Sequence, residues 1–333
     1  MTKQEEKAKA RPQEGVLEMG RNFELLAKLA IWLLTSLALS LFFFREFWTS
    51  LGAMLSPDWV FGQHHAAPWG VLGLCGIWLW LKRKDIWEKM ELRQGVASIP
   101  FGLALVAVAI LMPPSQNYLV FQVLLASLGV FVIFFSKAAK IPSILLGIYG
   151  GAISFPLIIE RFAKLPYSMS EIKPLLWILT SLGYSLDNQG QWVHFISASG
   201  EPISVVITAA CAGPATMGVF LAIFSLMMLD IPLPLKKAVW IFLFGAIGTW
   251  LQSFIRLIIL MLAGYHLGED AMWTAHFWSI YILFPLWYLL FVYIYFRQQD
   301  IKGKNGRDSV NGKRFLSTEI PTPMKRDGRK KFL

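Results

Sequence analysis

Three side chains in the second half of this sequence are of the types that acyl transfer requires. Cys211 carries a thiol, His276 an imidazole that titrates near neutral pH, and Arg256 a permanent cation. A thiolate can attack a carbonyl carbon to form a thioester, an imidazole can protonate the departing amine, and a guanidinium can stabilise the thiolate or the oxyanion. We therefore predict catalysis through a thioester if the fold brings these groups together, and we expect neither a cofactor nor a bound metal ion.

Each of these residues also has a purely structural interpretation. A lone cysteine in a helical membrane protein is usually a buried packing residue, and this is how we interpret the other cysteine, Cys75, in the apolar run VLGLCGIWLW. The histidine lies between Trp273 and Trp278 and can be an interfacial polar group. The arginine can snorkel to the membrane surface or pair with an outer carboxylate, such as Glu160, Glu269 or Asp270.

The elements that position these residues lie in a membrane. Hydrophobic residues make up 56% of the 333 residues and charged residues only 16%, and the mean hydropathy is +0.53. A helix needs ~20 apolar residues to cross ~30 Å of hydrocarbon. Eight runs come near this length, namely 25–44, 66–81, 97–112, 118–135, 141–159, 213–228, 238–263 and 273–296. The run 175–186 is too short to cross and predicts an interfacial or re-entrant helix. The expected fold is an all-α polytopic membrane protein with about eight transmembrane helices.

Lysine and arginine residues indicate the orientation of these spans, because they are retained in short cytoplasmic loops. With the N-terminus inside, 25 of the 31 Lys and Arg residues fall in cytoplasmic segments. We therefore expect a multi-pass protein of the plasma membrane with both termini in the cytoplasm. The net charge of +10 then reflects topology and attraction to anionic lipid, and nucleic-acid binding is disfavoured.

The segment before Cys211 predicts a small extracytoplasmic β-hairpin. In QWVHFISASGEPISVVITAAC, two runs rich in Val, Ile and Trp flank the turn signal SASGEP. Cys211 follows the second run and precedes a helix that begins near Gly213, where the helix dipole and free N–H groups favour a thiolate or an oxyanion. The small neighbours of the cysteine leave room for a substrate backbone.

Arg256 and His276 are expected at the same depth of the membrane as Cys211. The span that starts near Ala238 runs outward, so ~20 residues place Arg256 just beneath the outer surface. His276 lies in the first turn of the last span, which starts at that surface. Gln252, one helical turn before the arginine, and the adjacent Ser253 are expected to support the guanidinium.

These motifs resemble the exosortases and archaeosortases, a family of multi-spanning membrane cysteine transpeptidases. The shared elements are AACAGP with Cys211, SFIRLI with Arg256 and TAHFW with His276, and the similarity covers about residues 172–296. The family commonly has an asparagine three residues before the arginine, where this chain has Ser253. The order and spacing of the three motifs make the resemblance more specific than any one of them.

The resemblance implies a membrane-embedded cysteine protease or transpeptidase that processes secreted proteins. Its substrates carry a C-terminal sorting signal, made of a short motif, a hydrophobic helix and a basic end. Cys211 would form the thioester, His276 would protonate the leaving amine, and Arg256 would stabilise negative charge. Transfer of the new C-terminus to a lipid head group is implied, whereas transfer to water would make the protein a plain protease.

The predicted organisation has four parts: a cytoplasmic leader (1–24), N-terminal scaffold helices (25–160), a catalytic membrane core (161–296) and a basic, disordered tail (297–333). Two other classes of protein stay open. A transporter would also place polar groups in spans, although usually near the midplane. A non-catalytic assembly subunit would need no nucleophile, and its Cys211 could be replaced without loss. The oligomeric state does not follow from the sequence.

Overall fold

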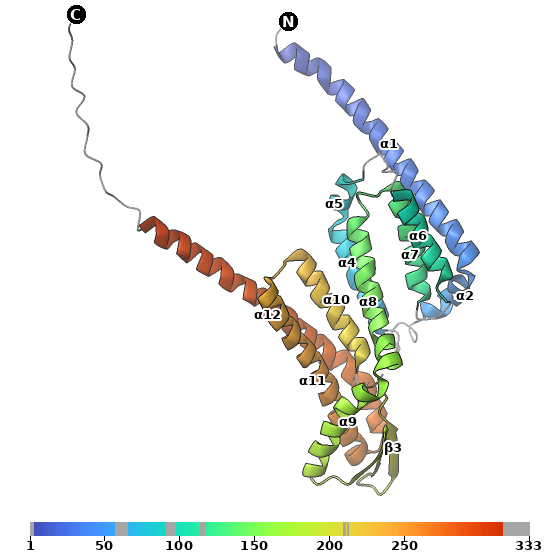
Figure 1. Ribbon diagram of the computed structural model, residues 1–333, viewed down its shortest axis with the longest axis vertical. Helices are drawn as coiled ribbons and strands as arrows, with labels where there is room; N and C mark the ends of the chain where they lie inside the picture. Colours follow the sequence, from blue (N-terminus) through green and yellow to red (C-terminus); the bar gives the residue numbers. More distant parts are fainter. Residues whose placement is uncertain are drawn as a thin grey trace, which may run out of the picture. The chain divides into compact units, whose positions relative to one another are not determined.

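The computed structural model describes residues 3–56, 66–90, 98–113, 118–208, 211 and 213–315, which form helices and one small sheet (Figure 1). In chain order the elements are α1 (Lys3–Phe43), α2 (Arg45–Met54), α4 (Ala66–Leu81), α5 (Arg83–Glu88), α6 (Ser98–Leu111), α7 (Leu119–Phe134), α8 (Lys140–Phe162), α9 (Lys164–Ser181), β1 (Leu186–Gln189), β2 (Trp192–Ile196), β3 (Pro202–Val206), α10 (Pro214–Asp230), α11 (Leu235–Leu267) and α12 (Glu269–Phe315).

Every hydrophobic run of the sequence coincides with a helix of the structure. Among the described residues, four helices are long and apolar enough to cross a membrane, namely Phe23–Phe43, Lys140–Phe162, Leu235–Leu267 and Glu269–Gln298. Four shorter apolar helices follow the other runs: Ala67–Leu81, Ser98–Leu111, Leu119–Phe134 and Pro214–Asp230. A polytopic helical membrane protein is therefore confirmed. The count of eight crossings stays a prediction, because the shorter helices fall below ~20 residues.

Two predicted boundaries were wrong. The short helix expected over 175–186 is α9, which begins at Lys164 and ends at Ser181. It ends there because Gly183 takes a positive φ of 91° and the N–H of Tyr184 bonds back to the carbonyl of Leu179, as in a Schellman cap. The last helix continues past residue 296 to Phe315, since adding residues to an existing helix is easier than starting one. Residues 316–333 lie outside the described residues, so disorder there stays a prediction.

The chain divides into two compact units within α12, residues 1–284 and 285–333. All the candidate site residues belong to the first unit. The second consists of the remainder of α12 and the tail.

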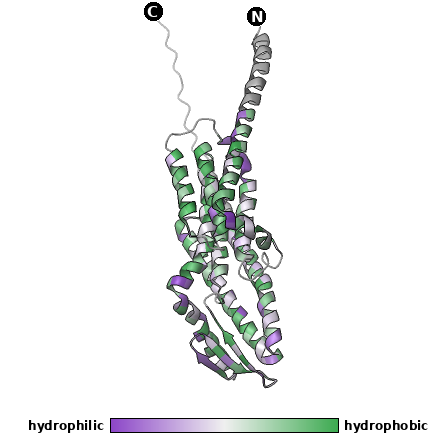
Figure 2. Ribbon diagram, turned by 90° about the vertical axis from the view of Figure 1, so that its right-hand side faces the viewer, coloured by the Kyte–Doolittle hydropathy of each residue, from purple (hydrophilic) through white to green (hydrophobic). Residues whose placement is uncertain are grey.

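The hairpin expected around SASGEP is present, and a third strand extends it. The three strands are antiparallel in the order β1-β2-β3, with Phe195 opposite Ile203 across the hairpin. Strand β1 was missed because its sequence, LDNQ, is polar and largely exposed and shows no alternation of apolar residues. Figure 2 shows many hydrophilic residues on this sheet and hydrophobic residues along the helices.

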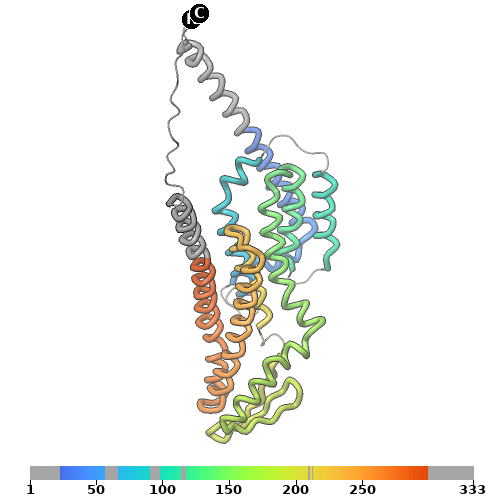
Figure 3. The backbone as a smooth tube through the Cα atoms, turned by 60° about the vertical axis from the view of Figure 1, so that its left-hand side comes forward, coloured from blue at the N-terminus to red at the C-terminus, as the bar shows by residue number. Residues whose placement is uncertain are grey.

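One face of the sheet is buried against two helices, and this packing positions the candidate site. Within the first unit, α9 and the strands lie together at one end (Figures 1 and 3). Their apolar side chains share a core with the second half of α11: Ile172, Leu175 and Leu179 from α9, Val193, Phe195 and Ile203 from the strands, and Phe254, Leu257, Leu260 and Met261 from α11. The loop that carries Cys211 leaves β3 at the edge of this core.

Candidate active site

Cys211 lies in a turn between β3 and α10, as the sequence predicts. Its N–H donates to the carbonyl of Thr208 at 3.0 Å, and its Sγ lies 3.5 Å from the Thr208 hydroxyl. The thiol is free and only partly buried, and it packs against the core of α9, the sheet and α11. The first residue of α10 is Pro214, and no side chain caps this helix end. The cysteine is therefore accessible beside a helix N-terminus.

Gly213, which follows the cysteine loop, packs closely against Ser253 on α11. It caps α10 in the left-handed conformation, with φ of 76°, which glycine adopts without strain. A Cβ added here would lie 2.6 Å from the Ser253 hydroxyl oxygen. That hydroxyl in turn donates to the Cys211 carbonyl at 3.5 Å. Ser253 thus contacts the backbone of Cys211, and its expected support of Arg256 stays a prediction.

Arg256 and His276 form a buried pair that joins α11 to α12. Only 5% of Arg256 and 9% of His276 is exposed. The arginine Nη2 lies 3.0 Å from Nδ1 and 3.1 Å from Nε2 of the imidazole. A guanidinium only donates hydrogen bonds and a neutral imidazole has a single lone pair, so at most one of these two contacts is a hydrogen bond. The guanidinium therefore lies directly against the imidazole ring.

The ion pairs considered as structural alternatives for Arg256 are absent. Glu160, Glu269 and Asp270 do not pair with the guanidinium, and a Glu269 oxygen accepts the indole N–H of Trp273 at 3.2 Å instead. The α11–α12 packing turns the guanidinium toward His276 instead. The acid that interacts electrostatically with Arg256 is Glu171, on α9.

Glu171 on α9 is a further ionisable residue near this site that the sequence reasoning missed. Its side chain is fully buried, and neither carboxylate oxygen accepts a hydrogen bond of normal length and angle. Arg256 interacts electrostatically with both Glu171 and Cys211, and its Nε likewise lacks a hydrogen-bond partner. Arg256 therefore links Cys211, on the loop before α10, to Glu171 on α9 through electrostatic interactions.

Burial keeps the Glu171 carboxyl protonated. Glu171 lies on α9, which is not among the candidate membrane spans. Desolvation raises its pKa from 4.5 to about 8, and the nearby Ser253 hydroxyl and Arg256 charge offset only part of this rise. A signal in the sequence could have found this residue. Glu171 shares the spacing of Ser168, Ile172, Leu175 and Leu179, which form the buried face of α9. Acidic residues are rare on a buried face because burying a charge is costly, so such a residue is a candidate for a functional role.

The other predicted residues have less defined surroundings. Gln252 is half-buried, and its side-chain oxygen has no hydrogen-bond partner, so its support of Arg256 stays a prediction. Cys75 is buried, with its Sγ 3.7 Å from the Leu145 carbonyl. This agrees with a packing role for that thiol.

A helical membrane protein with a cysteine loop beside a buried Arg–His pair is the class that this fold and site define. The chain belongs to the transmembrane exosortase family, whose model (Exosortase_EpsH) matches residues 59–293. The match includes every candidate site residue and reaches well before the segment 172–296 in which the motifs lie. No curated protein and no solved structure matches the chain.

Proposed function

We propose that this protein is a membrane-embedded cysteine transpeptidase that cleaves the C-terminal sorting signal of secreted proteins. The observation that carries the proposal is the position of Arg256, which bonds His276 and interacts electrostatically with Cys211. One cation thereby couples the nucleophile to the group that transfers protons. Membership of the exosortase family supports the same reaction class.

In the proposed reaction, the contact between Arg256 and His276 first opens, and the freed ring nitrogen of His276 takes the proton of the Cys211 thiol. The thiolate attacks the scissile carbonyl carbon, and the oxyanion is stabilised by Arg256 and by the N–H groups of Ala215 and Thr216, since Pro214 at the start of α10 has none. The C–N bond then breaks as His276 gives its proton to the leaving amine. The thioester is released by an acceptor, either an amine or hydroxyl of a lipid head group or water. This last step regenerates the thiol.

The proposal places Cys211 at the outer face of the plasma membrane and both termini in the cytoplasm. The distribution of Lys and Arg residues supports this orientation. A substrate whose hydrophobic helix lies in the bilayer would present its motif at that face after export. Residues 161–296 would form the catalytic core and 25–160 a scaffold, preceded by a leader (1–24).

Hydroxylamine tests the thioester directly. The substrate is a secreted protein from the same genome that ends in a short motif, a hydrophobic helix and a basic tail, supplied to membranes that contain the full-length enzyme. Hydroxylamine attacks thioesters readily, so we expect mass spectrometry to find a hydroxamate at the new C-terminus of the product. A product formed at the normal rate with no hydroxamate would rule out a thioester. Membranes without the enzyme serve as the control.

The buried carboxyl of Glu171 predicts how stability depends on pH. Between pH 4.5 and about 8 the unfolded chain has an ionised Glu171, whereas the folded chain keeps it neutral. The free energy of unfolding should therefore fall as pH rises through this window and level off above it. Glu171→Gln cannot ionise, so it should gain stability over the wild type from pH 5 to pH 8, by at most about 5 kcal/mol.

Thermal unfolding in detergent across this pH range measures the effect. Glu160→Gln is the matched control, because Glu160 is exposed and its replacement should leave the pH profile unchanged. If the unfolding temperatures of the wild type and Glu171→Gln changed in parallel from pH 5 to pH 9, the carboxyl would not be buried and neutral.

A further inference from the structure

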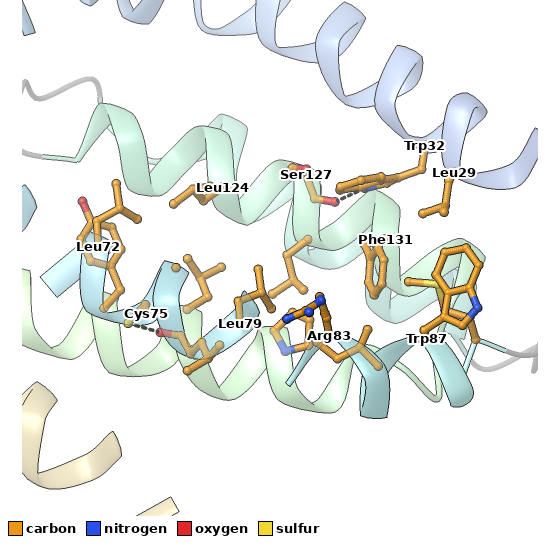
Figure 4. A pocket seen from close by; sticks show the side chains of 18 residues that line it. Leu29, Trp32, Leu72, Cys75, Leu79, Arg83, Trp87, Leu124, Ser127 and Phe131 are labelled. Atoms are coloured by element: carbon orange, nitrogen blue, oxygen red, sulfur yellow. Dashed lines mark hydrogen bonds between the residues drawn. The ribbon is translucent and has the colours of Figure 1, made fainter. Parts of the chain in front are cut away.

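A cavity of about 590 Å³ lies among α1, α4, α5, α7 and α8, and none of its lining residues belongs to the candidate active site. Three helices line it with the same spacing. Starting at Leu72, Leu124 and Pro142, each contributes residues i, i+3, i+4 and i+7, which is one face of a helix. The cavity therefore follows the helix axes for about two turns, or ~10 Å. Figure 4 shows Leu72 toward one end and Trp87 at the other.

The lining of this cavity is mostly apolar, although Ser127 on α7 and Tyr149 on α8 carry hydroxyl groups. Cys75, Leu79 and Phe131 are typical of its walls, and Arg83 is the one charged residue among those that line it. The Arg83 guanidinium is held in place, because it lies 4.2 Å from the centre of the Trp80 ring and its Nη1 donates to the Trp80 carbonyl at 2.8 Å. Its side chain is exposed, and most of its five N–H groups remain available to a ligand.

We propose that this cavity binds one acyl chain of an anionic phospholipid, whose phosphate is held by Arg83. An apolar cavity does not hold water stably. In a membrane, the abundant apolar molecules that could fill it are lipid acyl chains. Charge favours an anionic head group: Lys84 and Lys89 are exposed close to Arg83 in the sequence, and basic sites between membrane helices on the cytoplasmic side bind such lipids. By the positive-inside rule, this end of the cavity is cytoplasmic.

A small molecule suits the cavity better than a substrate helix. The cavity has about 590 Å³, which lies in the range of small-molecule sites, about 300–1,000 Å³. The basic end of a sorting signal would also be repelled by Arg83. The proposal does not depend on the cysteine chemistry.

Native mass spectrometry of the full-length protein in detergent tests the proposal with two probes, palmitoyl-oleoyl phosphatidylglycerol and the corresponding phosphatidylcholine. The wild type should retain phosphatidylglycerol in preference. Gly76→Leu should lose most of the retained lipid, because Gly76 lines the cavity and an added Cβ meets no atom within 4 Å. Gly73→Leu is the matched control: it lies on the same helix with equally open space, outside the cavity lining, and should bind like the wild type.

Arg83→Gln separates the head group from the chain. It should reduce the preference for phosphatidylglycerol over phosphatidylcholine by about fivefold, since each cation near an anionic surface contributes ~1 kcal/mol. Phosphatidylcholine binding should weaken less, because the choline cation offsets the charge of its phosphate. Equal retention of phosphatidylglycerol by Gly76→Leu and Gly73→Leu would overturn the site. Equal retention of the two lipids by the wild type would overturn the role of Arg83. Displacement of lipid by a hydrophobic peptide that ends in basic residues would show a substrate site instead.

Discussion

Cys211→Ala should abolish maturation of a substrate that carries the sorting signal, with a loss of several orders of magnitude to the background rate. Without the sulfur no thioester can form, and the neighbouring groups have no nucleophile to assist. Cys211→Ser should fail nearly as completely, because a hydroxyl is a far weaker nucleophile than a thiolate at neutral pH. Immunoblots that separate the precursor from the mature form in intact cells measure this result.

Cys75→Ala is the matched control for the nucleophile. Cys75 is a free thiol as well, but it is buried among α4 and α8 side chains and its Sγ contacts only the Leu145 carbonyl as a polar partner. We expect normal maturation by this variant and normal membrane levels for all three. Normal processing in cells with Cys211→Ala would refute the cysteine mechanism.

Arg256→Ala should slow maturation by about 10²–10³-fold, the usual loss when one group that stabilises an oxyanion is removed. Arg256→Lys should be nearly as slow. A lysine keeps the charge, but it has a single amine in place of a planar fork, so it cannot bond His276 and interact with Cys211 at the same time. Rates of precursor cleavage, normalised to the amount of enzyme in the membrane, measure both variants.

Variants of His276 distinguish proton transfer from electrostatic support at that position. His276→Ala should cost about 10²-fold, because it removes general acid and base catalysis but leaves the nucleophile. Partial activity of His276→Arg would indicate electrostatic support at this position, and complete loss would indicate proton transfer. Lys28→Ala is the control for removing a cation from a span, since Lys28 pairs with Glu24 on α1 and should not matter for the reaction. Wild-type rates for both Arg256→Ala and His276→Ala would contradict the site.

The helices and the hairpin could be predicted from the sequence because their causes are local. A bilayer requires continuous apolar runs, and each run of this chain became a helix. The two apolar runs around SASGEP became β2 and β3, and the pair Gly213–Pro214, two residues after Cys211, starts α10. The position of the nucleophile at a helix start was therefore visible without any tertiary information.

The partners of Arg256 were decided only by tertiary packing. A buried guanidinium needs neighbours, and the sequence offers several acids at similar depth without ranking them. The shared core of α9, the sheet and α11 brings Glu171 to Arg256 across 85 positions of the chain, while the turn into α12 presents His276. Such contacts depend on how helix faces meet, and local hydrophobic periodicity carries no information about which faces meet.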